Sequence, residues 1–224
     1  MNAKLYLIST PIGNYEDITL RALKVLRSVD FIICEEFKQA RRLLSHHQIE
    51  KELLSLNEHN EEESVKEIIP LLEAGKHAAL ISDCGTPLFS DPGHILVEEC
   101  IVRKIEIIPV PGVNSLLPAL TMSGLDIEKF YYYGWLSPKK DIRRKELLDL
   151  KQKKELIVLL DTPYRLIRLL KDIQKHFGSN QHIVLAYKIT MEGEQYFRGN
   201  VGNILRICEQ KKLKGEFVLL IDNR

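Results

Sequence analysis

Strand-like and helix-like segments alternate through the first half of this chain, which limits the folds that it can adopt. Short apolar runs predict strands at 4–9, 31–34, 53–56, 78–82 and 106–110, and amphipathic stretches predict helices at 17–27, 38–46, 64–74 and 92–103. Such alternation is typical of a mostly parallel sheet with helical crossovers. The first half is therefore predicted to be an α/β domain.

The second half has a different pattern. Helices are expected at 114–123, 141–151, 163–177 and 202–210, and strands at 129–135, 155–160, 182–188, 195–198 and 216–222. The segment 182–199 has the pattern of a hairpin, which indicates a mixed sheet. A length of 224 residues suits two small domains, so we expect domains at 1–112 and 113–224.

One loop of the first half is unusually rich in Gly, Pro and Asp. The apolar run that ends at Ser82 is followed by Asp-Cys-Gly-Thr-Pro at 83–87 and by Ser-Asp-Pro-Gly at 90–93. Ligands of open α/β sheets bind where strands end in such loops. We expect Gly85 and Gly93 to let the backbone approach a ligand, and we expect Asp91 to cap a helix that begins at Pro92.

Two other loops have a similar composition and also follow predicted strands. They are Ser-Thr-Pro-Ile-Gly-Asn at 9–14 and Pro-Val-Pro-Gly-Val-Asn-Ser at 109–115. Because parallel strands end at a common edge of the sheet, the three loops are expected to meet there. Their convergence predicts a small-molecule site.

Composition and charge exclude several classes of protein. Apolar residues make up 45% and charged residues 28% of the chain, and the net charge is +1, so no strong overall field attracts nucleic acid. The four cysteines form no Cys-x-x-Cys pair, and no apolar run reaches the roughly 18 residues of a membrane span. With no signal-peptide pattern at its start, the chain is expected to be cytoplasmic and reduced, without a bound metal.

Several motifs together resemble one known family. They are Ser9–Asn14, Ser82–Pro87 with Asp91–Gly93, Pro111-Gly112, Arg198-Gly199 and Gly215-Glu216-Phe217. In their order and spacing they are similar to the tetrapyrrole methylase superfamily, and within it to the branch that methylates the 2′-oxygen of a cytidine in small-subunit ribosomal RNA. The resemblance implies two α/β domains with S-adenosylmethionine in the cleft between them, usually in a homodimer.

The resemblance also implies roles for particular residues. Its predicted cofactor contacts are Pro11, Gly13, Asp83, Gly85, Thr86, Asn114, Ser115, Leu160 and Ala186. A 2′-hydroxyl benefits from a general base, and Glu35 and Glu36 are the carboxylates nearest the predicted crevice. Structured RNA is the expected partner, and the basic segment 139–154 predicts RNA contacts at Lys139, Lys140, Arg143 and Arg144.

Two departures from the family pattern leave alternatives open. Phe37 and Lys38 stand where the family usually has Thr and Arg, and the sequence ends at Arg224, where the ribosomal RNA enzymes have an additional segment. One alternative is therefore a methyltransferase of the same fold that acts on a small molecule or a protein side chain. The other is a non-catalytic module that binds S-adenosylmethionine and works through its dimer surface.

Overall fold

The computed structural model describes residues 3–224, which divide into two compact units between Asn114 and Ser115. In the first unit the elements are β1 (Lys4–Ile8), η1 (Tyr15–Asp17), α1 (Leu20–Ser28), β2 (Phe31–Cys34), α2 (Phe37–His46), β3 (Glu52–Ser55), α3 (Glu61–Glu73), β4 (Ala78–Ile81), α4 (His94–Val102) and β5 (Glu106–Val110). The five strands form one sheet in the order β3-β2-β4-β1-β5, and every neighbouring pair is parallel.

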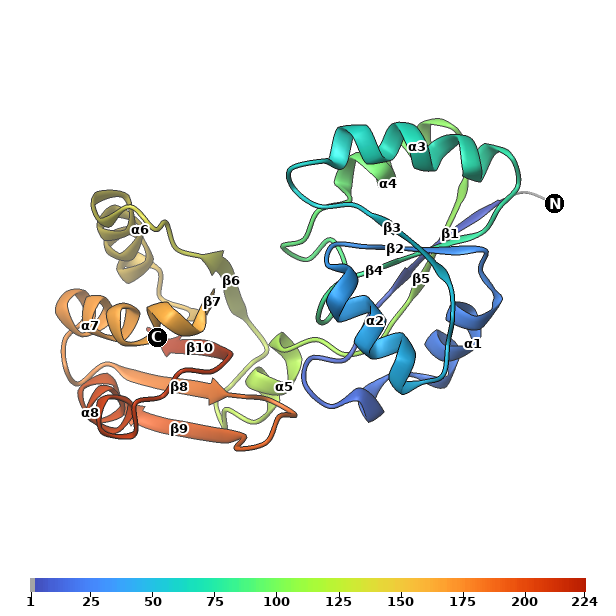
Figure 1. Ribbon diagram of the computed structural model, residues 1–224. Coiled ribbons are helices and arrows are strands. Elements are labelled where there is room, and N and C mark those ends of the chain that lie inside the picture. Colours follow the sequence, from blue (N-terminus) through green and yellow to red (C-terminus); the bar gives the residue numbers. More distant parts are fainter. Residues whose placement is uncertain (1–2) are drawn as a thin grey trace. The chain divides into compact units, whose positions relative to one another are not determined.

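The core of this unit has two layers, one on each face of the sheet. Strands β2 and β4 are buried at every residue, as expected of central parallel strands that helices cover on both faces. Leu26 and Leu43 bring α1 and α2 against one face, and Ile68 and Leu96 bring α3 and α4 against the other. Figure 1 shows the two helical layers.

In the second unit the elements are α5 (Leu116–Thr121), β6 (Phe130–Trp135), α6 (Lys140–Gln152), β7 (Leu156–Asp161), η2 (Pro163–Arg165), α7 (Leu166–Phe177), β8 (His182–Tyr187), β9 (Gln195–Asn200), α8 (Val201–Lys211) and β10 (Phe217–Asp222). The sheet order is β6-β7-β10-β8-β9, parallel only between β6 and β7. Helices α6, α7 and α8 pack against one of its faces (Figure 1). The predicted α/β fold, with one parallel and one mixed sheet, is confirmed.

The start of α4 differs from the prediction. The helix begins at His94 with Gly93 at its N-cap, so Asp91 and Pro92 lie outside it. The cap comes from another helix, because the Glu61 carboxylate accepts hydrogen bonds from the Gly93 and Ile95 N–H groups, each at 2.9 Å. A carboxylate at a helix N-terminus satisfies its unpaired donors and complements the helix dipole.

The cysteines differ sharply in exposure. Cys34, Cys100 and Cys208 are buried, whereas Cys84 is exposed in the loop that follows β4. No helix among the described residues is long and apolar enough to cross a membrane.

Candidate active site

The carboxyl edge of the first sheet carries four loops. They follow β1 (9–14), β2 (35–36), β4 (82–93) and β5 (111–114), and we call the edge that they form the rim. The loops meet at one edge because the strands are parallel. Of the predicted cofactor residues, Pro11, Gly13, Asp83, Gly85, Thr86 and Asn114 all lie on these loops.

Backbone hydrogen bonds join the first and third of these loops. The Thr10 N–H donates to the Gly85 carbonyl at 2.8 Å, and the Gly85 N–H donates back to the Thr10 carbonyl at 3.1 Å. Gly85 has a φ of +84°, a conformation that favours glycine. The loops are therefore held in a fixed relation before any ligand binds.

The polar groups of the two glycines have partners within the protein, and their expected role in letting the backbone approach a ligand stays a prediction. Both polar groups of Gly85 bond Thr10, and the Gly93 N–H bonds Glu61. A side chain at position 93 would also stand 3.0 Å from side-chain atoms of Leu80 and Leu88. Gly93 is therefore required for packing, and Gly85 joins two loops of the rim.

Hydroxyl groups connect the remaining loops. The Ser9 and Thr86 hydroxyls lie 3.1 Å apart, and the Thr86 hydroxyl donates to the Val113 carbonyl at 3.5 Å. Gly112 leaves room for this contact, because a Cβ there would lie 3.0 Å from the Ser9 Cβ. Residues from three strand ends thus pack into one surface, and the exposed Thr86 lies on it.

The rim is acidic. Glu35, Glu36, Asp83 and Asp91 all lie on its loops, and no Lys, Arg or His of residues 3–224 comes within 4.0 Å of their carboxylates. Burial raises the pKa of Glu35, Asp83 and Asp91, and the charge of Asp83 raises the pKa of Glu35 further. Asp83 accepts one hydrogen bond, from the Glu36 N–H at 3.2 Å. A bound cation would relieve this uncompensated negative charge.

This charge suits the donor that the resemblance implied. S-adenosylmethionine carries a cationic sulfonium and a cationic ammonium group beside one carboxylate, so its net charge is positive. Half-buried carboxylates without a protein cation are suitable partners for such groups, since the interaction strengthens in a partly desolvated site. The rim therefore fits this donor through its side chains.

The second unit brings two other predicted residues together. Leu160 of β7 and Ala186 of β8 both pair with Val218 of β10, so the three form one row across the sheet. Ala186 is fully buried and Leu160 is half-buried. Ser115 is at the N-terminus of α5 in the same unit.

Arg143 is not available for RNA, so the prediction that it contacts RNA is wrong. Its side chain is 2% exposed, and its Nε donates to Asp172 at 2.7 Å. Its Nη1 donates to the carbonyls of Ser137 and Pro138 at 3.0 and 2.9 Å. Lys139, Lys140 and Arg144 are exposed, as RNA contacts must be.

A second arginine, Arg165, stabilises the same part of the second unit. Arg165 pairs with the buried Asp161 at 3.2 Å and donates to the Leu136 carbonyl at 2.9 Å. Burial raises the pKa of Asp161, whose Oδ2 has no hydrogen-bond partner among the described residues. The segment after β6 is thus held by two arginines, and Arg143 belongs to this support.

The sequence interpretation also missed a group of residues. They are three exposed cations on α2: Lys38, Arg41 and Arg42. The N-cap of this helix is Glu36, whose N–H donates to Asp83. The sequence of α2 itself could have indicated this group, since it contains three cations and no acidic residue.

Comparison with known proteins defines the class to which this fold and rim belong. The sequence profile of the Tetrapyrrole (Corrin/Porphyrin) Methylases matches residues 4–205. A solved cobalt precorrin-4 methyltransferase has the same fold, with a TM-score of 0.71 at 20% identity over 97% of this chain and 94% of its own. The chain belongs to the tetrapyrrole methylase family and is an S-adenosylmethionine-dependent methyltransferase.

Curated relatives narrow the similarity to one branch. A protein of Thermotoga maritima named ribosomal RNA small subunit methyltransferase I is 42% identical over 99% of both chains. Proteins of the same name from Synechocystis and Bacillus subtilis are 39% and 37% identical over 97% of this chain, and the matches cover 78% and 74% of their lengths.

Proposed function

We propose that this enzyme transfers a methyl group from S-adenosylmethionine to the 2′-oxygen of a cytidine in the RNA of the small ribosomal subunit. The uncompensated carboxylates of the rim are the structural observation that carries the proposal. The similarity to the three named relatives over nearly the whole chain supports the RNA substrate.

Asp83 is the proposed partner of the donor's cationic part. It is half-buried, the Glu36 N–H fixes its position, and no protein cation of the described part neutralises it. Gly85 positions this loop through its pairing with Thr10. Ser115, Leu160 and Ala186 remain predicted donor contacts from the second unit.

The donor supplies an electrophilic methyl carbon, and the protein must supply a reactive oxygen. We propose that Glu35 accepts the proton of the 2′-hydroxyl as the new O–C bond forms. Burial and the charge of Asp83 raise its pKa, which makes its carboxylate a stronger base. Glu36, exposed at the N-cap of α2, is the alternative acceptor.

Two measurements test this function separately. Calorimetry should show that Asp83→Asn loses at least tenfold in affinity for S-adenosylmethionine, because the amide keeps the bond to Glu36 but removes the charge. Glu98→Gln, an exposed change on α4, should bind like the wild type. Normal binding by Asp83→Asn would remove Asp83 from the site.

The substrate is tested with radiolabelled donor and small ribosomal subunits that lack the modification. The label should appear in a single RNA fragment after nuclease digestion, and Glu35→Gln should lower kcat by about 100-fold if it removes a general base. Label found only in protein or in metabolites would contradict the RNA substrate.

The proposal includes a cytoplasmic homodimer. Exposed apolar side chains of the second unit support self-association: Leu117, Met122, Trp135 and Ile142 are 55%, 51%, 45% and 46% exposed. The proposed ribosomal substrate supports a cytoplasmic location. Light scattering that finds only monomer at micromolar concentration would contradict the dimer.

A further inference from the structure

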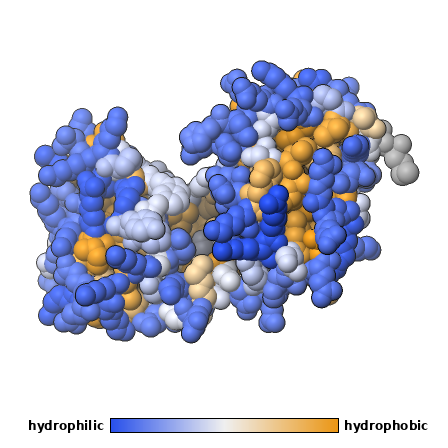
Figure 2. Space-filling model, in the orientation of Figure 1, coloured by the Kyte–Doolittle hydropathy of each residue, from blue (hydrophilic) through white to orange (hydrophobic). Residues whose placement is uncertain are grey.

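The outer face of α2 is strongly basic. Lys38, Arg41 and Arg42 are exposed, and none of them has a carboxylate of residues 3–224 within 4.0 Å. The helix itself contains no acidic residue. In Figure 2 the surface over α2 is strongly hydrophilic. Exposed cations that no protein anion satisfies are available for an external polyanion.

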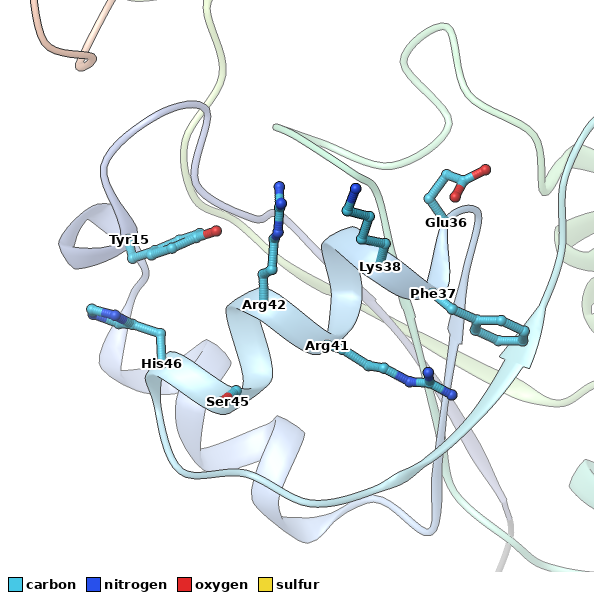
Figure 3. A pocket seen from close by; sticks show the side chains of 8 residues that line it. All are labelled: Tyr15, Glu36, Phe37, Lys38, Arg41, Arg42, Ser45 and His46. Carbon is cyan, nitrogen blue, oxygen red and sulfur yellow. The ribbon is translucent and has the colours of Figure 1, made fainter.

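These cations line a hollow that aromatic rings also border. The hollow has a volume of about 760 Å³, and Tyr15 of η1 and His46 of α2 lie at one end of it. Figure 3 shows Lys38, Arg42 and the Tyr15 hydroxyl on the same side of α2. The Tyr15 and His46 rings are 4.9 Å apart, and the Arg41 guanidinium lies 5.6 Å from the Phe37 ring centre.

The hollow is continuous with the rim. Its lining includes Glu36, whose N–H donates to Asp83 at 3.2 Å, and α2 begins at the next residue. The surface therefore changes from acidic to basic within about one helical turn. Such an arrangement suits a cationic donor that reacts with an anionic polymer.

We propose that the α2 face, defined as Lys38, Arg41, Arg42, Tyr15 and His46, binds the phosphodiester backbone of the substrate RNA next to the methylated nucleotide. This inference rests on the proposed function. Arginine and lysine bind backbone phosphates, and aromatic rings beside them stack on unpaired bases. The basic helix α6 is less suited, because Asp141, Glu146 and Asp149 are interspersed there and Arg143 is buried.

The test compares two double variants that each remove two positive charges. Arg41→Gln/Arg42→Gln changes the α2 face, and Lys66→Gln/Lys104→Gln is the matched control. The control residues are exposed: Lys66 lies on α3, and Lys104 follows the C-cap residue of α4. Both helices pack against the other face of the sheet. Affinity for deproteinised small-subunit RNA is measured by fluorescence anisotropy at several salt concentrations.

The α2 variant should bind this RNA at least tenfold more weakly than the wild type near physiological salt. The slope of log affinity against log salt should fall by about 1.4, since each lost phosphate contact with a single strand contributes roughly 0.7. Its affinity for S-adenosylmethionine should stay within about twofold of the wild type, because neither arginine lies on the rim. The control should match the wild type in both measurements.

Two results would overturn the inference: an α2 variant that keeps the wild-type affinity and salt slope, or a control that loses as much as the α2 variant. Methyl transfer by the wild type to small subunits is measured in parallel. If no transfer occurs, the proposed function fails, while the binding comparison still decides whether the α2 face holds RNA.

Discussion

At the scale of single residues, Asp83 has the strongest chemical consequence. Burial and the nearby charges of Glu36 and Asp91 raise its pKa, whereas the Glu36 N–H stabilises its charged form. The ionised form of Asp83 is therefore less stable in the free protein than an ordinary exposed aspartate would be. A bound cation stabilises this ionised form. Donor binding and the loss of the Asp83 proton therefore favour each other, and donor affinity depends on pH.

This connection predicts that donor affinity is highest at neutral pH and falls as the pH drops through the raised pKa of Asp83. The loss should begin at a higher pH than an aspartate with its usual pKa of 3.8 would give. Protonation removes the attractive charge, and donor binding lowers the pKa, so binding should release protons in this range. Calorimetry in buffers of different ionisation enthalpy measures that release, and Asp83→Asn should reduce it strongly.

Gly85 offers a second prediction at this scale. Gly85→Ala should destabilise the protein by about 1–2 kcal/mol, because a side chain at φ +84° is strained. Gly124→Ala is a suitable control, since Gly124 has φ +76° and an added Cβ there would meet no atom of residues 3–224 within 4 Å. Both variants should unfold similarly in urea, and only Gly85→Ala should weaken donor binding. Equal donor affinity in the two variants would mean that Gly85 does not contribute to donor binding.

At the scale of elements, contacts between helices decide features that local sequence does not. Glu61 caps α4 from a position 32 residues earlier in the chain. Glu61→Ala should lower the free energy of unfolding by about 2 kcal/mol, because two N–H groups lose a charged acceptor. Glu62→Ala, exposed in the same turn of α3, should change it by less than about 0.5 kcal/mol. Urea denaturation measures both, and equal effects would mean that the cap contributes nothing.

Helix α6 contains two adjacent arginines with opposite roles. Arg143→Met should cost about 3 kcal/mol in the free energy of unfolding, because it leaves Asp172 without its buried partner. Arg144→Met, at an exposed position, should leave stability nearly unchanged and weaken RNA binding slightly. Thermal unfolding and RNA binding together distinguish the two roles. If Arg143→Met bound RNA more weakly and kept the wild-type melting temperature, Arg143 would be an RNA contact after all.

At the scale of the whole molecule, the charges are locally separated although the net charge is only +1. The rim attracts a small cation, and the α2 face attracts a polyanion. Raising the salt concentration should therefore raise the KM for small ribosomal subunits steeply, while the Kd for S-adenosylmethionine changes much less. Initial rates at several salt concentrations check this expectation. Parallel changes in both constants would contradict the separation.

Sequence patterns predicted the strands well, because most of them are apolar runs of strand length that end at polar loop residues. The rim was also predictable, since parallel strands must end at one edge. The predictions that were wrong concern features that depend on contacts between distant segments. The cap of α4 is one case, because Glu61 took the role that local sequence gave to Asp91.

Arg143 is the second case, and here a signal was present. Arg143, Leu147 and Leu150 follow helical spacing and are all buried, so the arginine occupies the apolar stripe of α6. A count of charges along the segment could not distinguish it from its exposed neighbour Arg144. The position of a charge on a helix is thus more informative than the number of charges.

The exposure of Cys84 makes it a natural reporter. A maleimide dye would react there and leave the three enclosed thiols untouched, so the wild-type protein needs no engineering before it is labelled. Since the neighbouring residue is Asp83, occupancy by the methyl donor would slow the alkylation. The rate of labelling, measured by fluorescence, would then report whether the donor is bound.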